Sequence, residues 1–312
     1  MENGTCDFIN GKGNLPMMMK NIWKVCAGLL AMAQLAGCGS QLTAAAGVAD
    51  AISSAESSET LAKEQTPQEA GITYQVVTEV REDTLYADDG VQLAHYRYEI
   101  PVLQALRADG TQIETAETGA ENAALAITDA FDRQFDDWVE DGTLREMAQE
   151  QYAQQPELFA QYGIFYEDQW TYTAYTTDRL ASIDASNYSF YGGAHPNTVL
   201  MGWNFDLQEG TFLRPSAIAG DVGSFLETIQ EELERQLPEN AAELGYSENV
   251  HSILKNWDSY AVSFDETGMH VNFSPYELAC YAAGAQYFLV DYGVLDPLLS
   301  EEGRALLGRS RV

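Results

Sequence analysis

Hydrophobic and polar residues alternate with a period of two in two stretches between residues 72 and 100, as in half-buried β-strands. Asp88, Asp89 and Gly90 separate the stretches and are typical of a hairpin turn. One face of the first stretch consists of Ile72, Tyr74, Val76, Thr78 and Val80. The second stretch alternates two sets of side chains, Tyr96, Tyr98 and Ile100 against His95, Arg97 and Glu99.

The spacing then changes to that of an amphipathic helix. Apolar residues three or four positions apart form a single stripe: Ala124, Ile127, Phe131, Phe135 and Trp138. Asp141 and Gly142 interrupt the pattern. Thr143 followed by Glu146 predicts a capping box, in which two side chains satisfy the first free N–H groups of a second helix.

The same order of strands and helices returns in the second half. Alternation predicts strands over 170–174 and 199–205, and a second hairpin whose strands, 260–264 and 269–273, flank the turn 265–268. Between them, Ser224 with Glu227 predicts a capping box, and Ser247 is expected to cap a short helix. A helical stripe is formed by Leu226, Ile229, Leu233 and Leu237, before Pro238. The order predicts an α+β fold with antiparallel sheets, helical insertions between strands and two similar halves.

The first 37 residues have the pattern of a secretory signal peptide. Lys20 and Lys24 form a positively charged region, and the apolar stretch 25–37 follows. Residues 1–16 show no periodicity and precede three consecutive methionines. We therefore expect 1–16 to be a misassigned start, with translation beginning at Met17, Met18 or Met19.

The apolar stretch ends at Leu35-Ala36-Gly37-Cys38, which resembles the lipobox of bacterial lipoproteins. Lipid attached to the Cys38 thiol would hold the protein on the extracellular face of the cell membrane. An ordinary secretory signal that happens to end in cysteine is the alternative. Residues 38–70 contain no aromatic side chain and are expected to form a flexible tether after the lipidated cysteine.

Acidic residues outnumber basic ones, 48 to 16, which gives a formal net charge of −32. This charge excludes nucleic acid as the main partner because phosphates would be repelled. It favours a cationic protein as a partner, although solubility alone also explains an acidic surface. The chain is 46% hydrophobic and 11% aromatic, as expected of a globular protein. No apolar run reaches the roughly 18 residues that a membrane-spanning helix needs.

No catalytic or metal-binding motif stands out in this sequence. Of the four histidines, His95, His195, His251 and His270, none is spaced with Asp, Glu or Cys as metal ligands are. The HExxH, CxxC, EF-hand, G-x-S-x-G, P-loop and G-x-G-x-x-G patterns do not occur. Neighbouring acids are expected by chance among 48, so we expect no enzyme, no metal and no cofactor. An enzyme acting on envelope polymers would need two carboxylates, or His195 with an acid and a nucleophile, in one cleft.

Two short stretches carry more information. In YGGAHPN (191–197), Gly192 and Gly193 are expected to form a structural turn because glycine accepts positive φ. Tyr191 and His195 are candidate ligand-binding residues there, although a satisfied histidine in a structural turn is the plainer interpretation. The other stretch, FSPYEL (273–278), follows the second hairpin.

The second stretch offers Pro275 and Tyr276 as candidate ligand-binding residues. A rigid Pro-Tyr pair presents an aromatic ring at low entropic cost, as binding hot spots often do. A packing corner explains the same residues equally well. Sequence reasoning leaves both interpretations open.

YGGAHPN, followed by WNFDLQEGTFL (203–213) and VNFSPYELACYAAGAQYFLVDY (271–292), resembles the extracellular domain of RsiV-type anti-sigma factors, which sense lysozyme. YEIPVLQAL (98–106) is similar to the companion domain that precedes it and that also occurs in PdaC-type peptidoglycan deacetylases. The resemblance implies a companion α+β domain at 71–184 and an RsiV-like α+β domain at 185–300.

The resemblance also implies that the Pro275-Tyr276 segment belongs to a lysozyme-contacting surface. This chain has a lipobox where the family has a transmembrane helix and a sigma-binding segment. We therefore expect a lipoprotein of the cell envelope that binds a cationic protein such as lysozyme, as decoy, inhibitor or sensor. The alternative is a non-catalytic module that binds peptidoglycan or another glycan, since tyrosines that stack on sugars are frequent between residues 162 and 191.

Overall fold

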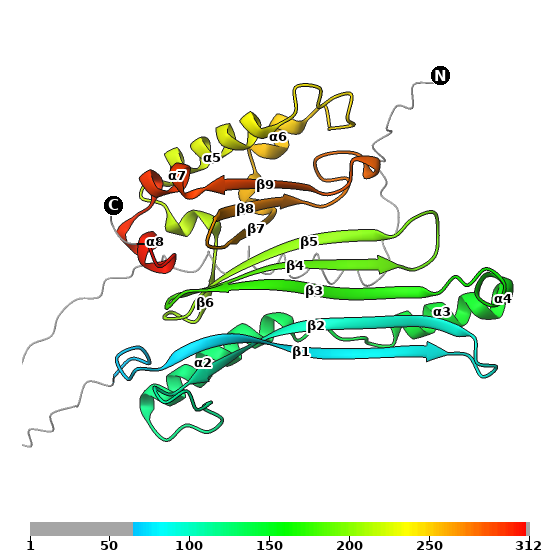
Figure 1. Cartoon of the computed structure of the whole chain (residues 1–312), viewed down its shortest axis with the longest axis horizontal. Coiled ribbons are helices and arrows are strands. Elements are labelled where there is room, and N and C mark those ends of the chain that lie inside the picture. The colour runs from blue at the N-terminus through cyan, green and yellow to red at the C-terminus, as the bar shows by residue number, and fades with distance from the viewer. Residues whose placement is uncertain (1–64, 310–312) are drawn as a thin grey trace, which may run out of the picture. The chain divides into compact units, whose positions relative to one another are not determined.

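The computed structural model describes residues 65–309 and shows a mixed α+β fold with two sheets (Figure 1). The predicted fold class is confirmed. Cys38, the signal peptide and most of the predicted tether lie outside the described residues. The larger sheet contains β1 (Thr73–Tyr86), β2 (Gln92–Leu106), β3 (Tyr166–Thr176), β4 (Leu180–Phe190), β5 (Asn197–Asp206) and β6 (Thr211–Leu213), in that order. The smaller sheet contains β7 (Ala261–Phe264), β8 (Gly268–Phe273) and β9 (Gln286–Asp291).

Helices lie between the strands, as the sequence order predicts, and two helices that were not predicted follow the last strand. The α-helices are α2 (Gly119–Asp132), α3 (Thr143–Gln154), α4 (Pro156–Ala160), α5 (Val222–Gln236), α6 (Val250–Leu254), α7 (Tyr292–Leu295) and α8 (Glu301–Leu306). Short 3₁₀ turns occur at η1 (Arg133–Phe135), η2 (Pro215–Ile218), η3 (Trp257–Ser259), η4 (Tyr281–Ala283) and η5 (Asp296–Leu298). The two hairpins occur where alternation predicted them, as β1–β2 and β7–β8.

One strand pairing departs from the antiparallel expectation. β2 and β3 pair in parallel, and α2, α3 and α4 form the crossover that a parallel pair requires. β4 was not predicted, because its core-facing residues Ala181, Ile183 and Ala185 include two alanines and give only weak alternation. The expected domain boundary between 184 and 185 falls inside β4, and the larger sheet contains strands from both sides of it.

The helix N-termini differ from the predicted capping boxes. α3 begins after Gly142 without a side-chain cap from Thr143, and Glu140 accepts instead from the N–H groups of Gly142 (2.9 Å) and Leu144 (3.1 Å). α5 is capped by Asp221, which accepts from the Ser224 N–H at 2.8 Å. A carboxylate ahead of each predicted position supplies the stronger acceptor, so both helices start earlier than the Ser or Thr signal indicates.

The short helix α6 also starts elsewhere than predicted. Its N-cap residue is Asn249 rather than Ser247, and Asn249 makes no side-chain capping bond. The Ser247 hydroxyl accepts from the Asn249 N–H at 3.2 Å, which places Ser247 in the turn before the helix. The predicted capping role of Ser247 is therefore wrong by two positions.

Aromatic side chains fill the space between α2 and the larger sheet. The predicted stripe is buried, and Trp138 stacks on Trp170 of β3 with ring centroids 4.2 Å apart. The α-helical part of the stripe ends at Asp132, and η1 carries Phe135 into the same core. A second core forms where Phe225, Ile229 and Leu233 of α5 pack against the smaller sheet.

The smaller sheet is joined to the larger one at β7. A Cβ on Gly202 of β5 would lie 2.3 Å from the Val262 carbonyl oxygen, so only glycine permits this approach. The Asn204 amide donates to the Val262 carbonyl at 2.9 Å, and the Phe264 N–H donates to the Ser182 hydroxyl at 2.7 Å. These bonds satisfy the edge of β7 and help to place the loop after β8 beside the β4–β5 loop.

Candidate binding site

The segment after β8 forms a tight turn with an unusual residue in it. The Glu277 N–H donates to the Ser274 carbonyl at 3.0 Å, Pro275 occupies the second position, and Tyr276 has a φ of 74°. These are features of a type II turn, whose third position normally takes Gly or Asn. Among residues 65–309, Tyr276 is the only residue other than glycine with a positive φ. This conformation costs an ordinary residue about 1–2 kcal/mol.

Hydrogen bonds from several sides hold this turn. The Ser274 hydroxyl accepts from the Leu200 N–H of β5 at 3.1 Å, and the Tyr276 N–H donates to the Ala279 carbonyl at 3.0 Å. The Glu277 carboxylate accepts from the Ser274 N–H at 2.6 Å. The strained residue therefore persists because its neighbours determine the backbone around it.

The β4–β5 loop is anchored through its first residues. Gly192 and Gly193 have φ values of 79° and 99°, and a Cβ on Gly192 would lie 3.3 Å from the Tyr166 hydroxyl. Tyr191 turns inward, and its hydroxyl donates to the Asp168 carboxylate at 2.9 Å. Tyr191 therefore contributes its hydroxyl to a buried network and anchors the loop that carries His195.

Asp168 is the centre of that network and has no exposed surface. Its carboxylate also accepts from the Tyr98 hydroxyl at 2.9 Å and from the Asn187 amide at 2.6 Å. Burial raises the pKa of Asp168, and the hydrogen bonds oppose that rise. A satisfied buried network of this kind gives the base of the loop one arrangement.

The two stretches singled out in the sequence meet at one place. The His195 ring stacks on Tyr281 with centroids 3.7 Å apart and an interplanar angle of 22°. Tyr276 lies 5.5 Å from the Tyr281 ring and 6.4 Å from the His195 ring, although it is 81 residues from His195 in the chain. We call His195, Tyr276 and Tyr281 the aromatic surface. Tyr276 is 53% exposed.

Hydrogen bonds set the orientation of the histidine within this surface. His195 Nδ1 lies 2.8 Å from the Pro196 carbonyl oxygen, an acceptor, so Nδ1 carries a proton. Nε2 faces the Tyr276 hydroxyl at 3.4 Å. The Tyr281 hydroxyl donates to the same Pro196 carbonyl at 2.9 Å, which fixes the ring on which His195 stacks.

Tyr281 is the member of the aromatic surface that sequence reasoning did not select. It follows the Pro-Tyr turn by five residues, in the stretch YAAG (281–284), and forms the start of η4. The signal available in the sequence was that Tyr281 lies close to Tyr276 along the chain. The contact between Tyr281 and His195 could not be predicted, because it depends on how the two sheets join.

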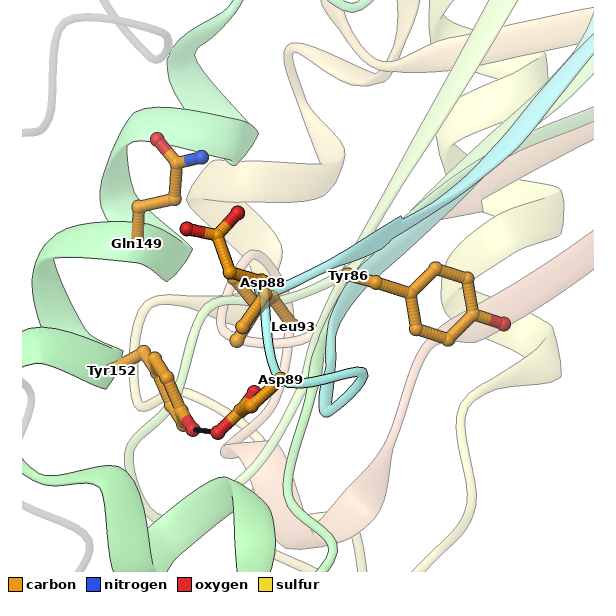
Figure 2. A pocket seen from close by; sticks show the side chains of 7 residues that line it. Tyr86, Asp88, Asp89, Leu93, Gln149 and Tyr152 are labelled. Atoms are coloured by element: carbon orange, nitrogen blue, oxygen red, sulfur yellow. Dashed lines mark hydrogen bonds between the residues drawn. The ribbon is translucent and has the colours of Figure 1, made fainter.

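A separate pocket of about 360 Å³ lies at the turn of the β1–β2 hairpin, beside α3 (Figure 2). The Tyr152 hydroxyl of α3 donates to the Asp89 carboxylate at 2.5 Å. The complete lining is Tyr86, Ala87, Asp88, Asp89, Leu93, Gln149 and Tyr152. No residue of this pocket was selected from the sequence as a ligand-binding candidate.

Two further findings concern the described part of the chain only. Between residues 65 and 309, no three or more His, Cys, Asp or Glu side chains are grouped so that they could hold a metal ion. None of the helices in that range combines the length and the apolar character of a membrane span.

Fold and geometry together define an α+β protein in which two loops build an exposed aromatic surface. Residues 220–293, which include that surface except for His195, match a family model described as "Protein of unknown function (DUF3298)". A solved structure from Bacteroides fragilis NCTC 9343, described as a DUF3298 family member, is 12% identical, with a TM-score of 0.46 over 76% of this chain and 96% of that chain. A DUF3298 family structure from Pseudomonas aeruginosa PAO1 is 14% identical, with a TM-score of 0.41; the match covers 73% of this chain and 95% of that chain. The curated proteins contain no match.

Proposed function

We propose that this protein is a lipid-anchored receptor on the outer face of the cell membrane that binds a cationic protein through the aromatic surface. The observation that carries the proposal is the strained, half-exposed Tyr276 held against His195 and Tyr281. An outlier of this kind is kept where it serves a function, because a glycine would form the same turn at lower cost. The proposed activity is binding rather than catalysis.

The charge of the chain supports a cationic partner. A net charge of −32 speeds encounter with a positively charged protein and makes the association rate fall as salt rises. An exposed tyrosine on a rigid turn then supplies the anchor, since tyrosine is enriched among hot-spot residues. Acidic residues would form the polar rim of the interface.

Lysozyme is the cationic protein that we propose as the ligand. The resemblance to RsiV-type domains supports this choice, because the turn that matches their lysozyme-contacting segment contains Pro275 and Tyr276. Measuring lysozyme activity in the complex separates an inhibitor, which lowers that activity, from a decoy or a sensor. The lipid on Cys38 would keep the complex at the membrane.

The test is titration calorimetry of the full chain with lysozyme at low and at physiological salt. Binding should persist at physiological salt, and Tyr276→Ala should weaken it at least fivefold, equivalent to about 1 kcal/mol. Tyr162→Ala is the matched control, because Tyr162 is 65% exposed and lies outside the aromatic surface; it should change the affinity less than twofold. Association that vanishes at physiological salt, or equal effects of the two substitutions, would refute the proposal.

A further inference from the structure

The pocket beside the β1–β2 turn is built from three parts of the chain. The turn supplies Asp88 and Asp89, β2 supplies Leu93, and α3 supplies Gln149 and Tyr152. It has a volume of about 360 Å³ and is largely open to solvent. It shares no residue with the aromatic surface, so it can be tested separately.

One of the two carboxylates is already engaged. Asp89 accepts from the Tyr152 hydroxyl at 2.5 Å and from the Val91 N–H at 3.3 Å. The hydrogen bond from Tyr152 is the largest cause of the lowered pKa of Asp89, so this carboxylate stays ionised and fixed. The bond also holds the Tyr152 ring against the turn, as Figure 2 shows.

The other polar groups are available to a ligand. The Asp88 and Gln149 side chains are exposed and make no hydrogen bond to residues 65–309, and in Figure 2 the Asp88 carboxylate projects on the side where Gln149 extends. Asp88 can only accept hydrogen bonds, whereas the Gln149 amide both donates and accepts. The Tyr152 ring adds apolar surface beside them.

These groups select one ligand chemistry. An anion would be repelled by Asp88 and Asp89, and a simple ammonium would satisfy Asp88 but offer no acceptor to the Gln149 N–H groups. Adjacent hydroxyl groups donate to a carboxylate and also accept from an amide, and the C–H face of a sugar ring can lie on an aromatic ring. We infer that this pocket binds a neutral sugar unit with adjacent hydroxyl groups.

The experiment titrates the full chain with two neutral oligosaccharides, chitotetraose and cellotetraose, and follows the amide NMR signal of Gly90 in the turn. At least one probe should bind saturably below 5 mM and shift that signal. Asp88→Asn removes a carboxylate without changing the shape, and Gln149→Ala removes the amide; each should weaken binding at least tenfold. Asp178→Asn, at an exposed acid in the β3–β4 turn, is the control and should leave binding within twofold.

Three results would overturn the inference. The first is no binding of either probe at 10 mM, and the second is binding that Asp88→Asn and Gln149→Ala leave unchanged. The third is displacement of a bound sugar by L-argininamide at lower concentration, which would make the pocket a cation site. Thermal unfolding of each variant shows that it is folded, and lysozyme binding by the same variants reports separately on the proposed function.

Discussion

Replacing Tyr276 by glycine and by alanine separates the strain of the turn from the use of its ring. Both substitutions remove the same half-exposed ring, but only glycine relieves a φ of 74°, which costs other residues about 1–2 kcal/mol. Glycine also gives the unfolded chain more conformational freedom, which lowers the stability of the folded state by about 0.4–1 kcal/mol. The difference leaves Tyr276→Gly more stable than Tyr276→Ala by about 1 kcal/mol. Both variants should lose lysozyme binding to the same extent.

Urea unfolding followed by tryptophan fluorescence measures this difference. For an m-value of about 2–3 kcal/mol/M, the midpoint of the glycine variant should lie about 0.3–0.5 M above that of the alanine variant, with equal m-values. Tyr276→Asn should fall near the glycine variant, because asparagine tolerates the left-handed region. An alanine variant as stable as the glycine variant would show that the turn is not strained at Tyr276, and the argument from strain to function would then fail.

Two further predictions concern pH and the lipid anchor. Burial raises the pKa of Asp132 to about 6, so the folded state binds a proton there more readily than the unfolded state does; stability should fall as pH rises from about 4 to above 6. The Asn side chain of Asp132→Asn can still accept from the Leu103 N–H, so this variant should show a flatter dependence of stability on pH between about 4 and 6. Urea unfolding at several pH values measures this dependence. The control Asp137→Asn, at an exposed site, should keep the slope of the unmodified chain. Cys38→Ala should abolish incorporation of labelled palmitate and release the protein from the membrane fraction; incorporation that survives the substitution would show that Cys38 is not the lipidated residue.

Strong local patterns predicted most of the elements. The alternation around Asp265–Gly268 and the stripe of α5 each contain enough apolar residues to define a strand or a helix without help from distant contacts. β4 shows the opposite case, because alanine and serine on a small-residue strand carry almost no periodic signal. The capping predictions failed at Thr143 and Ser224 because Glu140 and Asp221 accept from N–H groups nearer the start of each helix, including those of Gly142 and Ser224. Only the path of the chain before the helix decides which side chain reaches the first N–H groups.

The sequence by itself determined that this is an acidic α+β protein with a signal-like start and two loops that contain aromatic or histidine residues. Each of these properties depends on composition or on neighbours along the chain. Only the tertiary structure decided that His195 and Tyr276 meet over Tyr281, that Tyr191 turns inward to Asp168, and that Tyr276 has a positive φ. Those outcomes depend on the close approach of β5 and β7 at Gly202 and on bonds between distant residues. A contact between residues 81 positions apart is set by how the sheets pack, and periodicity along the chain carries no record of that packing.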